Sequence, residues 1–577
     1  MKVSTENSPS KRQYFPMTIA FAGSFCALAV SPFLSFEPIN LIKLFGLVIG
    51  AGLILPSFVT RIRLQKSQLT GLKKLTLLLT SILCLILVTN AWVYRDSFSD
   101  IFLGVFGRNN GILSYLALML IFAASIFIEK NQYPLMIRAF EITGNIVLAY
   151  ATIQILGLDP IDWTGEGPFS TLGNLNFSAA FMAMHASIII VKIFFNRELV
   201  WHTRTWFALV LLLELFVIWK TTSIQGLAMI LIVSTLLGIR FLSRMKIRTM
   251  LPMLVVSVTG GAIVFLGSLG IGPFGFLRQE TMLFRVDYWS AGLAMIAQNS
   301  IFGLGMDQYG NFYREYRNSA AATRNYFDRT ANTAHNIPID VAVGAGLVAG
   351  ICFLLIMFIS LYISLKYILT LNDYIGMTLG VVCIGFIFQQ FVSINQIGTA
   401  VWGWIFMGLI VNRSSQSLSL EKVLHNKQSS LKAKSTYIGS DFNRPKRTRL
   451  FLLKITSKLI VVFLAGSLVI NPLIRDAQFS RAVKKGDLER QWELAEAPGS
   501  NQFLMEFVLK NAVAQNDPSK ILKYAQQTSN RYPRSFYAWS VRAGLITSTL
   551  EERKRALEVL RSLDPLNTDI PMSPIEG

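Results

Sequence analysis

Long runs of apolar residues alternate with short polar segments along most of the chain. A helix needs about 20 apolar residues to cross the roughly 30 Å hydrocarbon core of a membrane. Runs of about this length predict about thirteen spans, near residues 16–36, 39–59, 75–94, 111–128, 138–157, 174–195, 206–220, 225–242, 250–270, 337–369, 375–393, 396–412 and 451–471. The pattern therefore predicts an all-α polytopic membrane protein, with about 12 core transmembrane helices and a 13th near the C-terminus.

Three segments depart from this apolar pattern and divide the chain. Residues 1–412 form the predicted membrane core, which contains one long polar loop at 271–336. Residues 413–450 are rich in Ser, Lys and Gln, which is typical of a flexible basic linker. The additional transmembrane helix at 451–471 follows, and the composition of residues 472–577 is that of a soluble helical domain.

Apolar residues recur at helical spacing in Arg534–Ile546 and Glu551–Leu563 of this last domain. The pair Trp539 and Ala543, then Ala556 and then Pro565 resemble positions of one degenerate tetratricopeptide unit. A short helical repeat and an unrelated helical cap are the two interpretations.

The distribution of charge predicts the orientation in the membrane. The formal net charge is +21, but the cations are concentrated in alternate loops, which is the pattern of membrane topology and not of nucleic-acid binding. Arg61–Lys74 has five basic residues and no acid, whereas 271–336 has six Arg against five acids. We therefore expect a cytoplasmic N-terminus, a cytoplasmic linker, and an extracytoplasmic loop and C-terminal domain, with no nucleic-acid partner.

Short motifs occur in the long polar loop, directly after it and in two earlier loops. They are, in order, Gly107-Arg108-Asn109-Asn110-Gly111, Thr171-Leu172-Gly173-Asn174-Leu175-Asn176, Arg285-x-x-x-Trp289, Phe302-Gly303-Leu304-Gly305, a loop rich in Tyr and Arg, His335-Asn336, and Gly346-Leu347-x-x-Gly350. Together they resemble the central signature of the O-antigen ligase and polymerase superfamily. The resemblance covers roughly residues 40–412. It implies a glycan-transferase core that works at the outer face of the cytoplasmic (inner) membrane without a metal or other cofactor.

The resemblance also implies the substrates. The donor would be a glycan linked to polyprenyl diphosphate, and the acceptor would be lipid A core, another glycan or a protein, in contact with membrane lipid. Ligases, polymerases and protein oligosaccharyltransferases of the superfamily share these motifs, so the acceptor remains open.

Two residues are the predicted catalytic groups. Arginine binds phosphate through a planar, permanently charged fork, so Arg285 suits the diphosphate leaving group. Imidazole can take a proton near neutral pH, so His335 suits the acceptor hydroxyl. Candidate donor- or glycan-binding residues are Arg108, Lys220, Gln225, Arg314, Arg317 and Asn336.

The sequence departs from the family pattern at Gln225. The family commonly has Ser-Arg-Gly where this chain has Ser223-Ile224-Gln225-Gly226, so a neutral side chain stands where a cation is expected. Lys220 could replace that cation, or the donor is held differently.

Each assignment has a structural alternative. His335 could belong to the cap of the next helix, Arg285 could pair with Asp287 or extend to the membrane surface, and the outer-loop arginines could be solvated. The acids Asp159, Asp162 and Glu166 have no histidine beside them, so we expect no metal site there.

Two other functional classes fit the hydropathy. A transporter of lipid-linked saccharide would favour polar or broken helices near the bilayer midplane. A scaffold that recruits enzymes would not need His335.

Overall fold

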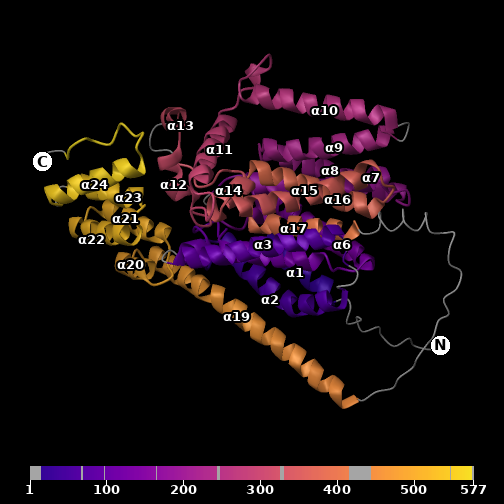
Figure 1. Cartoon of the computed structure of the whole chain (residues 1–577), viewed down its shortest axis with the longest axis horizontal. Helices are drawn as coiled ribbons and strands as arrows, with labels where there is room; N and C mark the ends of the chain where they lie inside the picture. Colours follow the sequence, from indigo (N-terminus) through magenta and orange to yellow (C-terminus); the bar gives the residue numbers. More distant parts are fainter. Residues whose placement is uncertain are drawn as a thin grey trace.

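The computed structural model describes residues 14–65, 69, 71–95, 98–163, 165–243, 247–324, 330–414, 444–545 and 548–574. Within these ranges the regular structure is helical and no strand is present (Figure 1). The all-α prediction is confirmed.

Thirteen helices coincide with the thirteen expected apolar runs. They are α1 (Tyr14–Leu28), α2 (Asn40–Gln65), α3 (Gly71–Val93), α5 (Ile112–Ser125), α6 (Tyr133–Ile155), α7 (Leu175–Phe195), α8 (Trp201–Lys220), α9 (Ile224–Ser243), α10 (Ile247–Ser268), α15 (Leu347–Leu369), α16 (Tyr374–Val392), α17 (Ile397–Arg413) and α19 (Arg444–Lys484).

Not all of these helices pass a test of length and composition for spanning a membrane. In the part of the chain that the structure describes, nine helices do. The helices α1 and α17 are shorter, and α5 and α6 are bent by 113° at the 3₁₀ turn η3 (Lys130–Gln132). The chain is therefore a polytopic membrane protein, while the number of spans stays a prediction.

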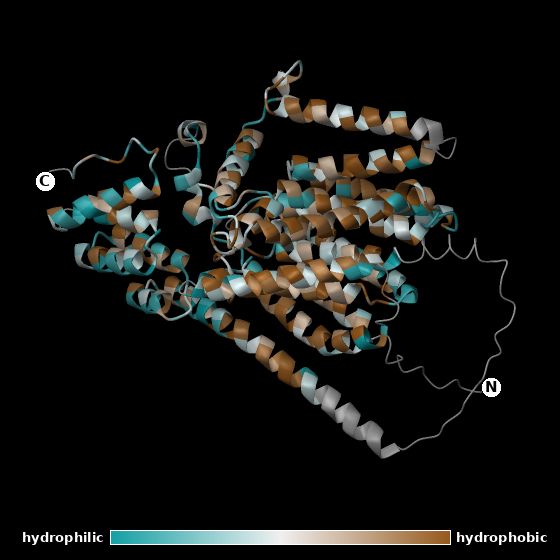
Figure 2. Ribbon diagram, in the orientation of Figure 1, coloured by the Kyte–Doolittle hydropathy of each residue, from teal (hydrophilic) through white to brown (hydrophobic). Residues whose placement is uncertain are grey.

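The core of the bundle lies around α17. Every residue from Ile397 to Asn412 is buried, and Trp402 and Trp404 are among the largest fully buried side chains. By contrast, only 6% of the α10 span is buried, and this largely apolar helix lies at the edge of the bundle (Figures 1 and 2). Both positions suit an apolar helix in a membrane, because such a helix can face lipid as readily as it faces protein.

The structure corrects the predicted span at 337–369. It is two helices, α14 (Ile337–Ala345) and α15, that break at Gly346, where φ is 92°. A Cβ atom at residue 346 would lie 2.2 Å from the carbonyl oxygen of Ile301, so the close approach of the preceding turn requires glycine.

The structure also changes the predicted linker and 13th helix. The continuous helix α19 extends from Arg444 through Pro472 to Lys484, so it passes without a break into the C-terminal domain (Figure 1). Residues 444–450 of the predicted linker are therefore helical. Residues 415–443 lie outside the described residues.

One end of the bundle carries the short helices of the polar loop. They are η5 (Gly275–Leu277), α11 (Glu280–Gln298), α12 (Tyr309–Tyr316) and α13 (Ser319–Arg324), together with α4 (Phe98–Leu103) and η4 (Ser170–Leu172). The C-terminal domain lies against the same end, and Figure 2 shows more hydrophilic residues in it than in the neighbouring apolar bundle. Which side of the membrane this end faces stays a prediction.

The C-terminal domain continues from α19 with α20 (Leu488–Glu496), α21 (Gln502–Gln515), α22 (Pro518–Arg531), α23 (Phe536–Gly544) and α24 (Leu550–Leu563). Successive helices pack on one another. The rings of Trp492 and Tyr524 stack with centroids 3.9 Å apart, and Thr549 and Glu552 form a capping box that starts α24. The tetratricopeptide interpretation stays a prediction.

Candidate functional site

A glycine turn fixes the polar loop to the break between α14 and α15. The backbone amides of Leu304 and Gly305 donate to the carbonyls of Val343 (2.7 Å) and Gly344 (3.0 Å). Gly303 has a φ of 69°, and a Cβ there would lie 2.4 Å from the Val343 carbonyl oxygen. The Phe302–Gly305 motif therefore serves a close backbone contact, which only glycine permits.

Asn90 of α3 holds the same turn from the side of the bundle. Its amide nitrogen donates to the carbonyls of Phe302 (2.8 Å) and Gly344 (3.0 Å), and its oxygen accepts from the Met306 amide (3.3 Å). Asn90 is buried. The glycine turn and the C-terminal end of α14 are thus tied to α3.

His335 lies immediately before α14 in an uncommon backbone conformation. Its φ is 50°, in the left-handed region that few residues other than glycine adopt. The backbone is held on both sides, because Asp340 accepts a hydrogen bond from the Ala334 amide (2.8 Å) and Asn336 caps α14 through the Ile339 amide (3.3 Å). Strain of this kind persists only where surrounding contacts impose it, and it concentrates at functional sites.

The imidazole of His335 stacks on an aromatic ring and keeps its nitrogens uncommitted. The ring centroids of His335 and Tyr288 are 5.8 Å apart with an interplanar angle of 29°. Among the described residues no group forms a hydrogen bond with the imidazole. Burial, and then the positive charges of Arg285 and Arg108, lower the pKa of His335 to about 4. At neutral pH the ring is therefore uncharged and can accept a proton.

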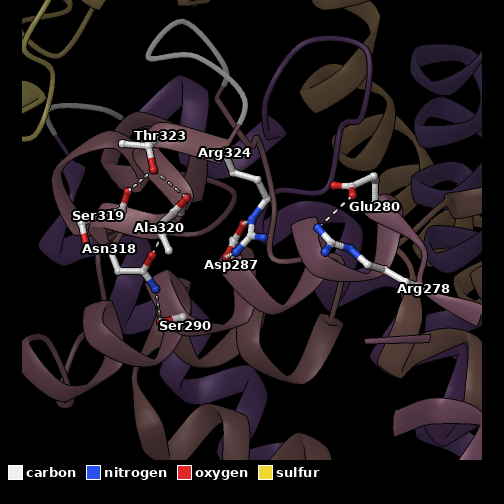
Figure 3. A network of polar contacts seen from close by, with 10 residues as sticks. Arg278, Glu280, Asp287, Ser290, Asn318, Ser319, Ala320, Thr323 and Arg324 are labelled. Atoms are coloured by element: carbon white, nitrogen blue, oxygen red, sulfur yellow. Dashed lines mark hydrogen bonds and ion pairs between the residues drawn. The ribbon is translucent and has the colours of Figure 1, made fainter. Parts of the chain in front are cut away.

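Arg285, on α11, has no acidic partner in the described part of the chain. The predicted alternative was a pair with Asp287, but Asp287 binds Arg324 of α13 instead, at 2.9 and 3.4 Å (Figure 3). The contact of Arg285 is with the sulfur of Met282 at 3.8 Å. Burial lowers the pKa of the Arg285 guanidinium, although arginine remains protonated in proteins. A half-buried cation without a counter-ion is suited to an anionic ligand.

The Asp287–Arg324 pair belongs to a small network that fixes α13 on α11. Figure 3 also shows the amide of Asn318 directed at the Ser290 hydroxyl, at 3.3 Å. Arg324 is the last described residue before the segment 325–329, which lies outside the described residues.

Arg108 reaches the His335 segment from a different loop. One guanidinium nitrogen donates to the Asn332 carbonyl (2.8 Å), and another pairs with Asp307 (3.2 Å). Asp307 also accepts from the Val105 amide (2.7 Å), so it holds the Gly107–Gly111 motif against the turn. The Nε atom of Arg108 is buried without a hydrogen-bond partner.

Asn336 and Gln225 both meet the C-terminal end of α16. The Asn336 amide donates to the Phe391 carbonyl (3.1 Å), and the Gln225 amide donates to the side chain of Gln389. Gln225 is buried, so a neutral amide pair occupies the position where the family has a cation.

Lys220 lies apart from this group, at the end of α8. Its side chain is exposed, and its ammonium lies 5.2 Å from the Trp219 ring centroid. No ion pair involves Lys220 within the described ranges. Its role in binding stays a prediction.

Arg314 and Arg317 face the C-terminal domain. Arg317 is buried and donates to both carboxylate oxygens of Asp564, each at 2.8 Å, and Arg314 donates to one of them at 3.0 Å. The predicted donor-binding role of these two arginines is untested, and the contacts described here give them a different partner.

The structure brings together His335, Arg285 and Arg108, while Arg314, Arg317 and Lys220 have other surroundings. Sequence reasoning missed Tyr288, Asp307, Asn90 and Asp564. Asp307 carried a weak signal because it lies two residues after the Phe302–Gly305 turn, whereas the other three depend on packing between distant segments. Among the described residues no cluster of three or more His, Cys, Asp or Glu side chains is arranged for a metal ion.

Comparison with known families identifies the segment that contains most of this site. Residues 169–354 match the family model described as O-antigen ligase. No curated protein matches the chain. The match includes His335 and Arg285 but not Arg108 or the C-terminal domain, and it supports a glycan-transferring, ligase-like function.

Proposed function

We propose that this chain, whose residues 169–354 match the O-antigen ligase family model, transfers a glycan from polyprenyl diphosphate to an acceptor hydroxyl. The reaction takes place at the outer face of the cytoplasmic membrane, with the N-terminus in the cytoplasm. The observation that carries the proposal is the arrangement around His335: an uncharged imidazole beside the uncompensated guanidinium of Arg285.

The chemistry assigns one task to each side chain. The acceptor oxygen attacks the anomeric carbon of the donor sugar and forms the new glycosidic bond. The bond from that carbon to the diphosphate oxygen breaks, and the electron pair leaves with polyprenyl diphosphate. The acceptor proton passes to a nitrogen of His335.

The arginines stabilise the charge that grows on the leaving group. Arg285 donates to the diphosphate oxygens and Arg108 adds positive charge nearby, in a half-buried site where such interactions are stronger than in water. Diphosphate needs no protonation to leave, so the scheme uses no general acid and no metal.

The acceptor separates three forms of the proposal. Lipid A core would make the protein a ligase, another glycan repeat would make it a polymerase, and a protein hydroxyl would make it an oligosaccharyltransferase. Surface-glycan analysis of cells that lack the chain distinguishes them. Loss of capped lipid A indicates the ligase, single-repeat products indicate the polymerase, and unmodified protein indicates the oligosaccharyltransferase.

The proposed activity is tested with purified protein in lipid vesicles. The vesicles contain polyprenyl-diphosphate-linked glycan from the source cells, an envelope extract from cells lacking the chain supplies the acceptor, and no nucleotide or ion gradient is present. We expect free polyprenyl diphosphate and glycan transfer with the wild type, and neither with the double variant Arg285→Ala, His335→Ala. Movement of intact donor across the bilayer without cleavage would instead identify a transporter and overturn the proposal.

A further inference from the structure

A single buried carboxylate connects the C-terminal domain to the polar loop. Asp564, at the end of α24, is 1% exposed, and its two oxygens accept hydrogen bonds from Arg317, Arg314 and the Asn567 amide (3.2 Å). Four donated bonds satisfy the acceptor capacity of a carboxylate. The two arginines come from α12 and its end, about 250 residues earlier in the chain.

A second contact between the C-terminal domain and α12 lies beside the Asp564 cluster. The Arg534 guanidinium lies over the Phe312 ring, 3.8 Å from its centroid, donates to the Asn311 carbonyl (3.0 Å) and pairs with Glu315. Arg314 in turn lies 4.2 Å from the ring centroid of Phe536 in α23. Both α12 and the C-terminal domain contribute cations and acids to this interface, so it is specific in its pairing.

Two tyrosines of α12 contact the candidate site. The Tyr309 hydroxyl donates to the Tyr288 carbonyl (2.6 Å), and the rings of Tyr313 and Tyr288 meet edge to face at 5.6 Å. Tyr288 is the ring on which His335 stacks. The helix α12 therefore lies between the C-terminal domain and the aromatic support of His335.

A helix of eight residues cannot hold this position by itself. Isolated helices shorter than about 12 residues are marginal in water, and tertiary contacts supply most of their stability. On the side of the site the contacts of α12 are aromatic, whereas its charged contacts are with the C-terminal domain.

We propose that the C-terminal domain positions the transfer site, and that Asp564 does so by holding Arg314 and Arg317 of α12, which in turn sets Tyr288 against His335. The inference rests on the proposed function of His335. It makes Arg314, Arg317 and Asp564 positioning residues that do not touch the donor, and it gives the C-terminal domain a part in catalysis although it lies outside the family match.

Charge exchange tests the pairing in the full-length protein. Asp564→Arg places a third cation beside the two arginines, and we expect transfer to fall about 10- to 100-fold, as small misplacements of catalytic groups do. The double variant Asp564→Arg, Arg317→Asp restores opposite charges and should recover to within about fivefold of the wild type. The control is Glu493→Arg, the same exchange at an exposed pair with Arg490 in the same domain, which should transfer as the wild type does.

A second measurement needs neither donor nor acceptor. Diethyl pyrocarbonate modifies the neutral imidazole, and mass spectrometry of the His335 peptide gives the rate at that residue alone. We expect Asp564→Arg and the milder Asp564→Asn to modify faster at His335 than the wild type, because Tyr288 no longer covers one face of the ring. The charge-exchanged double variant should return toward the wild-type rate.

The outcomes separate the two proposals. If the wild type transfers no glycan, the proposed function fails, while the modification rates still test the positioning role. Wild-type transfer and wild-type modification in both Asp564 variants would overturn the positioning role. A double variant that keeps the melting temperature of the wild type and yet stays as inactive as Asp564→Arg would also overturn it, because Arg317 would then be needed for the donor itself.

Discussion

Two pairs of arginines near the candidate site look alike in sequence and differ in their surroundings. Arg314 and Arg317 share the buried carboxylate of Asp564. Arg285 has no acidic partner among the described residues, and Arg108 keeps an unsatisfied Nε although it pairs with Asp307. The counter-ion, more than the position in a motif, therefore distinguishes Arg285 from Arg314 and Arg317 as a candidate for binding an anion.

The physical reason lies in the cost of an unpaired charge. A buried charge is tolerated where a partner compensates it, and removal of that partner is strongly destabilising. A protein that leaves Arg285 half-buried without an acid keeps a binding capacity that an anionic ligand can use. The charge of Arg317 is already compensated within the protein by the carboxylate of Asp564.

The largest expected effect follows from substitution of His335. Asparagine tolerates the left-handed backbone that His335 adopts and can cap a helix, but it is not a base. We expect His335→Asn and His335→Ala both to lose about 10²- to 10⁴-fold in transfer rate, the usual contribution of a general base. Steady-state assays of purified protein measure this, with His202→Asn in α8 as the control.

Normal activity of His335→Asn would contradict the general-base role of His335. If His335→Asn transfers at nearly the wild-type rate while His335→Ala lowers the melting temperature, His335 serves the backbone of the α14 start, and the site must then depend on the arginines.

A smaller loss is expected when Arg285 becomes lysine. The charge remains, but the planar fork that binds two phosphate oxygens is lost. We expect transfer to fall by roughly 10- to 1000-fold, as for removal of one stabilising donor. Arg278→Lys is the matched control, because Arg278 is exposed and pairs with Glu280 (3.2 Å). Equal activity of both variants at equal abundance would remove Arg285 from the donor site.

The pH profile sharpens the comparison further. His335 must be neutral to act as a base, and its lowered pKa of about 4 places the acid limb of kcat/KM near that pH, with a plateau at neutral pH. Bound diphosphate offsets the charges of Arg285 and Arg108, so it should raise the His335 pKa and move the acid limb of kcat to higher pH. Arg285→Gln should move the limb of kcat/KM in the same direction, while Arg285→Lys should leave it in place. Coincident limbs in kcat and kcat/KM would contradict this coupling.

The sequence predicted the parts of the molecule that depend on local pattern. Apolar run length located the thirteen apolar helices, and the motif order placed His335 and Arg285 in one segment. The break at Gly346 was not predicted, because the apolar run continues through this residue. Only the structure shows that the carbonyl of Ile301 packs against Gly346 and requires glycine there.

The partners of the arginines could not be predicted in the same way. Asp287 is close to Arg285 in sequence but binds Arg324, and Asp564 is about 250 residues from Arg314. Such pairs depend on how distant segments pack, and hydrophobic periodicity carries no information on them. The contact of Tyr288 with His335 was not predicted for the same reason, although Tyr288 lies beside the motif residue Trp289.

The smallest expected effect concerns Lys220, which could replace the arginine that the family pattern places at Gln225. The ammonium is exposed and lies beside the Trp219 ring, so solvent and salt screen its charge. We expect Lys220→Gln to raise the KM for the lipid-linked donor about two- to fivefold, without a change in kcat, in a buffer of low ionic strength. At about 1 M salt the difference should disappear, because the Debye length is then only about 3 Å, whereas the defect of Arg285→Lys in its half-buried site should persist. A loss in kcat as large as that of Arg285→Lys, insensitive to salt, would instead place Lys220 at the diphosphate and make it the functional substitute for the missing arginine.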